Sequence, residues 1–354
     1  MAQKKTLEAL RTTIKKKGYD WVAAETPQSA ISREEQKSLL GLTVDEAELK
    51  ATEAAIKSME DLTAFRAVPA APAAVDWRNN GGNWVTPVKD QKNCGSCVAF
   101  GTVGTMESRV RLACKNAGMA IDLSEAHLFY CGCGNCCGTG WNFPPALDFC
   151  KNPGVGVETS FPYTPGNQPC KGGVEPYAKI KAWTAILSMA DRENIIASKG
   201  PVVAGMAVYA DFFSYSSGVY MVTSNDLRGY HCICVVGYND TQKYWICKNS
   251  WGTGWGEAGF FKIGYGQAKI DTNFAFYDMD ALCPVPLCTQ YIPYLKNVLV
   301  AARTNSMLRA CLRYYICGVG SRPLCSAPVV RVVRSVWLIL SRCPQYRRPF
   351  CAVL

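Results

Sequence analysis

Three segments that lie far apart in this chain of 354 residues carry a thiol, an imidazole and a side-chain amide. Cys97 lies in QKNCGSCVAF, His231 lies 134 residues later in GYHCICVVGY, and Asn249 lies 152 residues after Cys97 in YWICKNSWG. A nucleophile, its base and the group that orients the base can be this far apart in sequence and meet in the folded chain. The fold must therefore bring three distant segments to one site.

Cys97 is the candidate nucleophile. A free thiol has a pKa of about 8.5, so it is mostly protonated at neutral pH, and the thiolate is the form that attacks. The residues after Cys97 read as a helix to about residue 116, and the positive end of that helix would face the sulfur. Of the two histidines, His127 follows LSEA in a helical segment and is expected at the surface or half-buried. His231 is therefore the expected base.

Asn249 has the expected task of holding the imidazole of His231 in one tautomer and one orientation. Trp251, two residues further on, would cover that hydrogen bond and exclude water. The glycine-rich sequence NSWGTGWG also favours a rigid turn with aromatic packing, which an orienting group needs.

The cysteines near Cys97 permit another interpretation. Cys94 and Cys97 form a C-x-x-C pair, which together with the CGCGNCC run at 131–137 would suit a redox dithiol or a zinc site. Neither use accounts for the imidazole and amide segments, so no metal and no cofactor are expected.

Together these segments resemble those of papain-like cysteine peptidases, over about residues 72–280. The resemblance implies an α+β fold of two lobes, in which a helical lobe carries Cys97 and an antiparallel β-rich lobe carries His231 and Asn249, with a cleft between them. It implies hydrolysis of peptide bonds in a peptide or protein substrate through an acyl-enzyme thioester. Gln91 and the backbone N–H of Cys97 would then form the oxyanion hole. A monomer is expected.

The resemblance also implies two disulfides. They would join Cys94 to Cys137, with Cys136 as the competing partner, and Cys131 to Cys170.

Part of the substrate-binding surface follows from the same resemblance. Gly140 would bind the substrate main chain, and Trp141 would form a wall of the pocket for the second side chain before the scissile bond. Trp251 is also assigned to the substrate-binding surface, and the floor of the pocket is expected near Asn273. The chain departs from the family at Val98, where an aromatic residue is usual, in its cysteines at 232 and 234, and in one residue inserted after Gly140. These departures bear on efficiency and preference more than on reaction type.

Strands are expected in the second half of the body. Short β-branched and aromatic runs separated by glycine lie at residues 202–208, 232–238, 244–248 and 260–264, and they read as antiparallel strands.

Residues 1–71 read as polar and mostly helical. Ser32 with Glu35, and Thr43 with Glu46, have the spacing of capping boxes, and Gly41 is placed to end the first of these helices. A Pro/Ala linker follows at 68–74. The segment could be a helical subdomain. The resemblance instead implies an inhibitory propeptide, and hence a zymogen, with a mature start near Pro72.

Residues 281–354 differ from the rest of the chain. They hold ten basic residues, seven cysteines and no acid, whereas residues 1–66 carry 11 basic and 11 acidic residues and residues 67–280 carry 17 of each. A disulfide-rich appendage or a basic tail for an anionic surface could give this composition. The sudden loss of all acids favours an unstructured segment without a native fold.

The composition also limits the partners and the compartment. A charge-balanced body gives no electrostatic case for nucleic acid, and no apolar stretch is long enough to predict a transmembrane segment. The 19 cysteines favour an extracytoplasmic or lysosome-like compartment, although the first residues do not read as a signal peptide. Two further activities stay open: a non-catalytic binding protein on the same fold, and transpeptidation if an amine outcompetes water.

Overall fold

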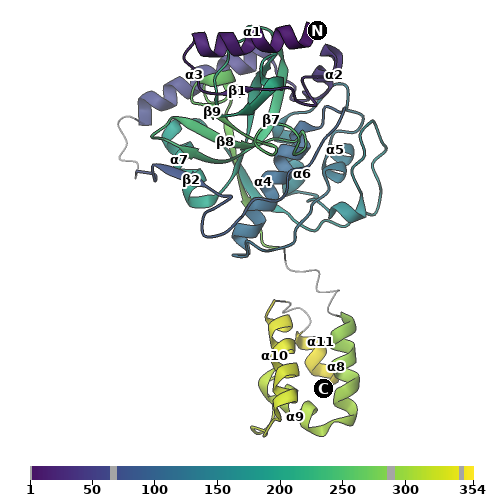
Figure 1. The fold of residues 1–354 in the computed structure, drawn as a ribbon. Helices are drawn as coiled ribbons and strands as arrows, with labels where there is room; N and C mark the ends of the chain where they lie inside the picture. Colours follow the sequence, from purple (N-terminus) through teal and green to yellow (C-terminus); the bar gives the residue numbers. More distant parts are fainter. Residues whose placement is uncertain (1, 64–69, 285–291, 343–346) are drawn as a thin grey trace. The chain divides into compact units, whose positions relative to one another are not determined.

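The computed structural model describes residues 2–63, 70–284, 292–342 and 347–354 (Figure 1). The chain divides into two compact units, residues 1–283 and residues 284–354. The first unit contains all the residues that the sequence analysis assigns to the site. Among the described residues, no helix is both long and apolar enough to cross a bilayer.

A mixed sheet forms one half of the first unit. Its strand order among the described residues is β3 (Ile180–Ile186), β10 (Phe276–Ala281), β4 (Val202–Tyr209), β7 (Leu227–Asn239), β8 (Tyr244–Lys248), β9 (Phe260–Gly264) and β6 (Val219–Tyr220), and β2 (Ala74–Asp76) also pairs with β7. The β6–β9 pair is parallel, and the other pairs are antiparallel. The four strands predicted from the sequence are β4, β7, β8 and β9, so those predictions are confirmed.

Helices form the other half of the first unit. They are α4 (Cys97–Ala113), α5 (Glu125–Gly132) and α6 (Phe143–Lys151), and α7 (Met189–Lys199) lies beside the sheet (Figure 1). Short 3₁₀ turns lie at Glu158–Ser160, Phe212–Ser214 and Gln267–Lys269. The residues of α4 are buried from Cys97 to Val110, because the helix has a sheet on one side and α5 and α6 on the other. Two apolar cores result, one around the sheet and one around α4.

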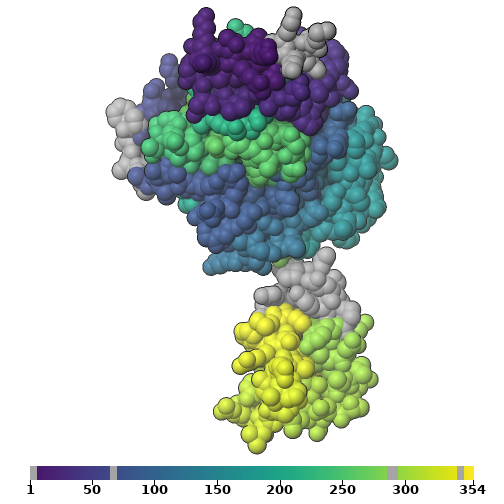
Figure 2. Space-filling view, in the orientation of Figure 1, coloured from purple at the N-terminus to yellow at the C-terminus, as the bar shows by residue number. Residues whose placement is uncertain are grey.

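The N-terminal residues pack on this body. Their elements are α1 (Ala2–Lys16), β1 (Val22–Ala23), α2 (Arg33–Ser38) and α3 (Glu46–Thr63), and β1 pairs with β5 (Tyr215–Ser217). Figure 2 shows the N-terminal residues in purple as a layer against the green residues of the strand-rich half. The capping box of Ser32 and Glu35 is present.

Two sequence predictions in this region are wrong. The helix α3 is capped by Asp45 and not by Thr43, because the Asp45 carboxylate accepts the backbone N–H groups of residues 47 and 48. The helix α2 ends at Ser38, so Gly41 does not terminate it. Gly41 instead lies against the backbone of Gly95, where a Cβ would not fit.

The second unit is helical in the structure, in contrast to the unstructured segment that its composition favours. It contains α8 (Ile292–Thr304), α9 (Ser306–Tyr315), α10 (Ala327–Arg342) and α11 (Arg347–Val353). Disulfides join Cys311 to Cys325 and Cys317 to Cys351. The prediction was based on the absence of acidic residues and did not consider the spacing of the apolar ones. These recur at helical spacing in the core of the second unit, at Val329, Val333, Val336 and Leu340.

Candidate active site

Cys97 is the first residue of α4 and is completely buried. Its Sγ accepts a hydrogen bond from the backbone N–H of Gly41 over 3.3 Å. The helix N-terminus favours negative charge on the sulfur. Burial opposes it and raises the pKa of the Cys97 thiol to about 11.

His231 lies in β7 and Asn249 directly follows β8. The His231 Nε2 and the Asn249 Oδ1 are 2.7 Å apart, and both residues are buried. Trp251 lies over this pair, with its ring 5.0 Å from the imidazole. Trp251 also stacks on Phe213 with ring centroids 5.2 Å apart. The pair is therefore buried, and aromatic packing holds it in place.

Gln91 connects the nucleophile loop with the segment after Asn249. Its Nε2 donates to the carbonyl oxygens of Leu39 (3.1 Å) and Cys94 (2.8 Å). Its Oε1 accepts from the Ser250 hydroxyl over 2.6 Å. The amide that the sequence analysis proposes as an oxyanion donor is thus buried, oriented, and occupied by a carbonyl from the N-terminal segment.

The buried site holds neutral groups in this state. Burial lowers the pKa of His231 to about 4, and its hydrogen bonds to Asn249 and to the Leu39 backbone offset this only in part. With the thiol pKa raised to about 11, Cys97 and His231 are a neutral thiol and a neutral imidazole at neutral pH. A thiolate–imidazolium pair requires solvent or another polar environment at the site.

Residues 39–43, called here the covering segment, keep solvent out. The backbone N–H of Trp141 donates to Gly41 O (2.8 Å), and the backbone N–H of Thr43 donates to Trp141 O (2.9 Å). On the other side, the Leu42 N–H donates to Tyr230 O (3.2 Å). The covering segment therefore pairs with backbone from both lobes.

Glycines allow this close approach. A Cβ on Gly41 would lie 1.8 Å from Gly95 O, and a Cβ on Gly140 would lie 2.3 Å from Gly41 O. Gly140 also has φ +79°, which favours glycine. Gly140 is expected from the sequence to bind the main chain of a substrate; the bonds to the covering segment are made by its neighbour Trp141, and Gly140 provides the room.

The pocket beside the covering segment is lined by Leu42, Asn273 and Phe274 among other residues. A Cβ on Gly205 would lie 2.7 Å from both Leu42 Cδ2 and Phe274 Cδ1, so the leucine side chain reaches that ring. The side-chain amide of Asn273 donates to the Glu53 carboxylate over 2.7 Å. The Trp141 ring is buried against Phe129, with ring centroids 6.2 Å apart.

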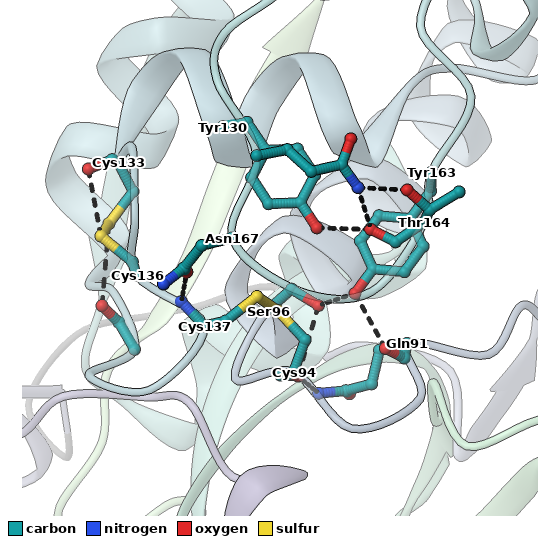
Figure 3. Close-up of a disulfide and its surroundings, with 12 residues drawn as sticks. Gln91, Cys94, Ser96, Tyr130, Cys133, Cys136, Cys137, Tyr163, Thr164 and Asn167 are labelled. Atoms are coloured by element: carbon teal, nitrogen blue, oxygen red, sulfur yellow. Dashed lines mark hydrogen bonds between the residues drawn. A yellow bond between two sulfur atoms is a disulfide. The ribbon is translucent and has the colours of Figure 1, made fainter.

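Disulfides frame the loop before Cys97 (Figure 3). In the structure Cys94 is bonded to Cys137 and Cys131 to Cys170. The competing candidate Cys136 is bonded to Cys133. Cys114 is also bonded to Cys283, a pair that the sequence analysis left unassigned.

Tyr163 is a residue at this site that the sequence analysis missed. Its hydroxyl donates to Gln91 O over 2.8 Å and lies 2.8 Å from the Ser96 hydroxyl (Figure 3). It therefore fixes the backbone on both sides of the nucleophile loop. Its only sequence signal was the aromatic FPY run at 161–163, which carries no hint of this contact.

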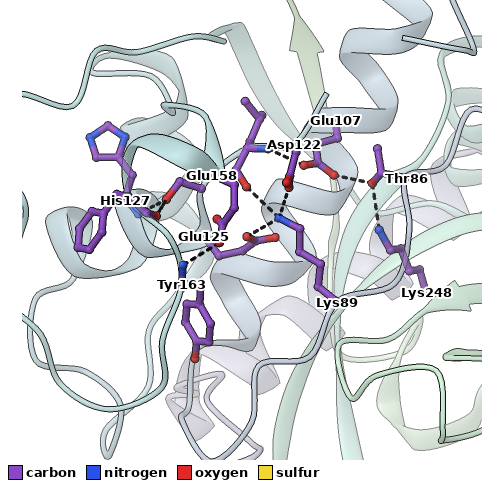
Figure 4. A network of polar contacts seen from close by, with 12 residues as sticks. Thr86, Lys89, Glu107, Asp122, Glu125, His127, Glu158, Tyr163 and Lys248 are labelled. Atoms are coloured by element: carbon purple, nitrogen blue, oxygen red, sulfur yellow. Dashed lines mark hydrogen bonds and ion pairs between the residues drawn. The ribbon is translucent and has the colours of Figure 1, made fainter. Parts of the chain in front are cut away.

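A buried charged network supports the same elements (Figure 4). Lys248, the residue before Asn249, donates to the Thr86 hydroxyl over 3.1 Å, and that hydroxyl donates to the Glu107 carboxylate. Nearby, Lys89 lies 2.7 Å from the Glu125 carboxylate, and this charge raises the pKa of Lys89 against the effect of burial. The contacts of Lys248, Thr86 and Glu107 connect β8 to α4, and the Lys89–Glu125 pair holds the start of α5.

The remaining candidates have structural roles. His127 is buried, and its Nδ1 accepts the Gly156 backbone N–H over 3.0 Å. Within the described part of the chain, no group of three or more His, Cys, Asp or Glu residues is placed to hold a metal ion.

Comparison with known proteins agrees with this geometry. Residues 71–277 match the sequence model of the papain family cysteine proteases. Cysteine proteinase 1 of Entamoeba histolytica is 35% identical over 211 residues, covering 54% of this chain and 64% of the relative. The cathepsin L-like proteinase of Fasciola hepatica is 38% identical over 210 residues, covering 57% and 63%. The chain thus matches just under two thirds of the length of these relatives.

Solved structures show the same fold. The digestive procathepsin L2 proteinase from the larval midgut of Tenebrio molitor aligns with a TM-score of 0.63 and 27% identity, covering 78% of this chain and 89% of that one. The recombinant stem bromelain precursor aligns with a TM-score of 0.60 and 23% identity, covering 78% and 89%.

Proposed function

The chain belongs to the papain family of cysteine proteases, and from that premise we propose that it hydrolyses peptide bonds through an acyl-enzyme thioester. The observation that supports this most is the buried pair of His231 Nε2 and Asn249 Oδ1, 2.7 Å apart, in a chain that also has a buried cysteine at the start of α4. A structural role does not require this combination of groups.

The chemistry follows from the arrangement once the covering segment leaves. Water entering the cleft relieves the burial that keeps both groups neutral, so the proton passes from Cys97 to His231. The thiolate attacks the substrate carbonyl carbon, and the Gln91 side-chain N–H and the Cys97 backbone N–H bind the oxyanion. His231 then protonates the leaving amine and activates the water that releases the acid.

Asn249 keeps Nδ1 of the imidazole directed at the sulfur throughout these steps. Because its Oδ1 lies at Nε2, the ring carries a proton on Nε2 and uses Nδ1 for proton transfer.

Residues 1–71 act as a propeptide in this proposal. The covering segment occupies the nucleophile through Gly41, the oxyanion donor through Leu39, and the main-chain site at Trp141. A substrate needs the same positions, so the full chain is a latent zymogen, as the precursor structures it resembles suggest.

The proposed substrates are peptides or proteins with an apolar side chain at the position that Leu42 occupies. Leu42 fills the space between Phe274 and Gly205, where an added Cβ would lie 2.7 Å from both side chains, so an apolar side chain fits there.

The disulfides within the described residues favour an oxidising, extracytoplasmic compartment. A lysosome-like compartment and a monomeric enzyme are the finer proposals.

Active-site labelling tests the function. After removal of the propeptide, the protein should hydrolyse a fluorogenic peptide, and a thiol-reactive epoxide should label Cys97 as located by mass spectrometry. Cys97→Ala should abolish both, whereas Cys232→Ala, which removes the neighbouring buried thiol, should leave both within about tenfold. Labelling at Cys232 or Cys234 would refute the assignment.

A further inference from the structure

The second unit concentrates exposed apolar side chains. Thirteen large apolar side chains are exposed among the described residues of the chain, and nine of them lie in this unit. They are Tyr294, Val300, Met307, Tyr315, Val319, Leu324, Trp337, Leu338 and Val353. Scattered apolar residues are normal at a protein surface, but this enrichment within a small unit points to a partner surface.

The same unit has uncompensated positive charge. Residues 281–354 carry ten Lys and Arg and no Asp or Glu, so no acidic side chain of the unit can pair with them. The basic side chains described as exposed are Lys296, Arg303, Arg313, Arg322, Arg331, Arg334, Arg347 and Arg348. The partner that this charge favours is anionic.

The helix α10 combines both features on one element. Its buried face packs Val333 and Val336 into the core of the unit. On the other side Arg331 and Arg334 are exposed, and Trp337 and Leu338 are 56% and 50% exposed. A cavity of about 350 Å³ beside them is lined by Tyr315, Cys325, Val330, Val333, Arg334 and Trp337. Aromatic and aliphatic side chains beside arginines are typical of helices that lie in a membrane interface.

We propose that the C-terminal unit binds the surface of an anionic lipid bilayer. Trp337 and Leu338 enter the boundary between head groups and acyl chains, and Arg331 and Arg334 contact lipid phosphates. The disulfides Cys311–Cys325 and Cys317–Cys351 hold the helices that present these side chains. A nucleic acid would satisfy the arginines but would leave the exposed apolar side chains of Val300 and Val353 in water, so the lipid surface is favoured.

Vesicle flotation tests the proposal with the full chain, carrying Cys97→Ala so that it does not digest itself. Vesicles of phosphatidylcholine alone are compared with vesicles that contain about one third phosphatidylserine. The protein should float with the anionic vesicles, and salt should weaken its binding. The pair Arg331→Gln and Arg334→Gln should weaken binding about 30-fold.

Two further variants separate lipid binding from simple charge attraction. Trp337→Ala with Leu338→Ala should weaken binding about tenfold or more, because the apolar insertion is lost. Lys151→Gln with Lys181→Gln removes two exposed charges from the first unit and should change binding less than about twofold. Far-UV circular dichroism checks that each variant is folded. If the Trp337→Ala, Leu338→Ala variant is unfolded, the comparison of the arginine double variant with its lysine control decides whether the C-terminal unit binds the vesicles.

Three results would overturn the proposal. The first is that the protein does not float with anionic vesicles. The second is that the lysine and arginine double variants lose vesicle binding equally. The third is that the Trp337→Ala, Leu338→Ala variant stays folded and binds vesicles and single-stranded RNA as the parent does. The last result would identify a general polyanion site.

Discussion

Replacing Gly41 by alanine should release the active site from the covering segment. The new Cβ would lie 1.8 Å from the backbone oxygen of Gly95, and backbone cannot move aside as a flexible side chain can. The covering segment must therefore withdraw by roughly 1.6 Å or more to reach ordinary van der Waals separation, which begins at 3.4 Å.

The magnitude follows from the contacts that this withdrawal breaks. They are the hydrogen bonds from Gly41 N to Cys97 Sγ (3.3 Å), from Trp141 N to Gly41 O (2.8 Å), and from Gln91 Nε2 to Leu39 O (3.1 Å). At about 1 kcal/mol each, their loss costs about 3 kcal/mol. Such a change increases the open population about 150-fold, since 1.4 kcal/mol corresponds to a factor of ten.

Alkylation of Cys97 by iodoacetamide in the full-length protein measures the open population. Gly41→Ala should be labelled about 100-fold faster than the parent. Gly138→Ala is the matched control, because a Cβ there has no neighbouring atom within 4 Å, and it should be labelled at the parental rate. Equal rates for Gly41→Ala and the parent would show that the covering segment does not protect the thiol.

Four further outcomes are expected. Gln91→Ala should reduce the turnover of the activated enzyme by about 10²–10³ while changing iodoacetamide labelling much less; unchanged turnover would make Gln91 a loop residue. Acid should open the cover: the pKa of His231 is lowered to about 4 in the latent form, against about 6.5 for an exposed imidazole. Neutral, buried His231 therefore stabilises the covered form fully above pH 6.5, and this stabilisation falls by up to about 1.4 kcal/mol per pH unit toward pH 4. Added protease should accordingly cut residues 39–43 of the Cys97→Ala protein faster near pH 4 than near pH 7. His231→Gln should reduce this pH dependence of the cleavage rate. Lys248→Met removes the buried ammonium group that donates to the Thr86 hydroxyl and should lower the free energy of unfolding by about 1–3 kcal/mol, against less than about 0.5 kcal/mol for the exposed Lys181→Gln in urea denaturation. Truncation after Pro284 should keep turnover within about twofold, whereas truncation after Asp280 removes the Cys283 partner of Cys114 and should lower thermal stability.

Much of the fold could be predicted because its signals are local in sequence. The four strands have alternating or continuous apolar runs bounded by glycine, and α4 begins at a cysteine motif. The Ser32 capping box needs residues only three positions apart. The Asp45 cap was missed because Thr43 offers an equally good spacing, and sequence spacing alone cannot tell which of two capping residues adopts the extended backbone.

The contacts that sequence could not predict depend on segments that meet in space. Tyr163 reaches Gln91 across 72 positions and Lys248 reaches Thr86 across 162, and neither partner has a local pattern that marks it. The second unit was misjudged for a different reason. Its absence of acids describes its charge, whereas its helices depend on the spacing of apolar residues, and the two are independent.

The covering segment occupies the site without presenting a bond that Cys97 can cut. The thiol sulfur is held by the backbone N–H of Gly41, a donor and not an electrophilic carbon. The carbonyl oxygen at the Gln91 amide belongs to Leu39, two residues earlier. Attack requires that the carbon facing the sulfur and the oxygen at the amide belong to one peptide group. Here two different groups fill these positions, so binding of the segment blocks the site and gives no transition-state stabilisation.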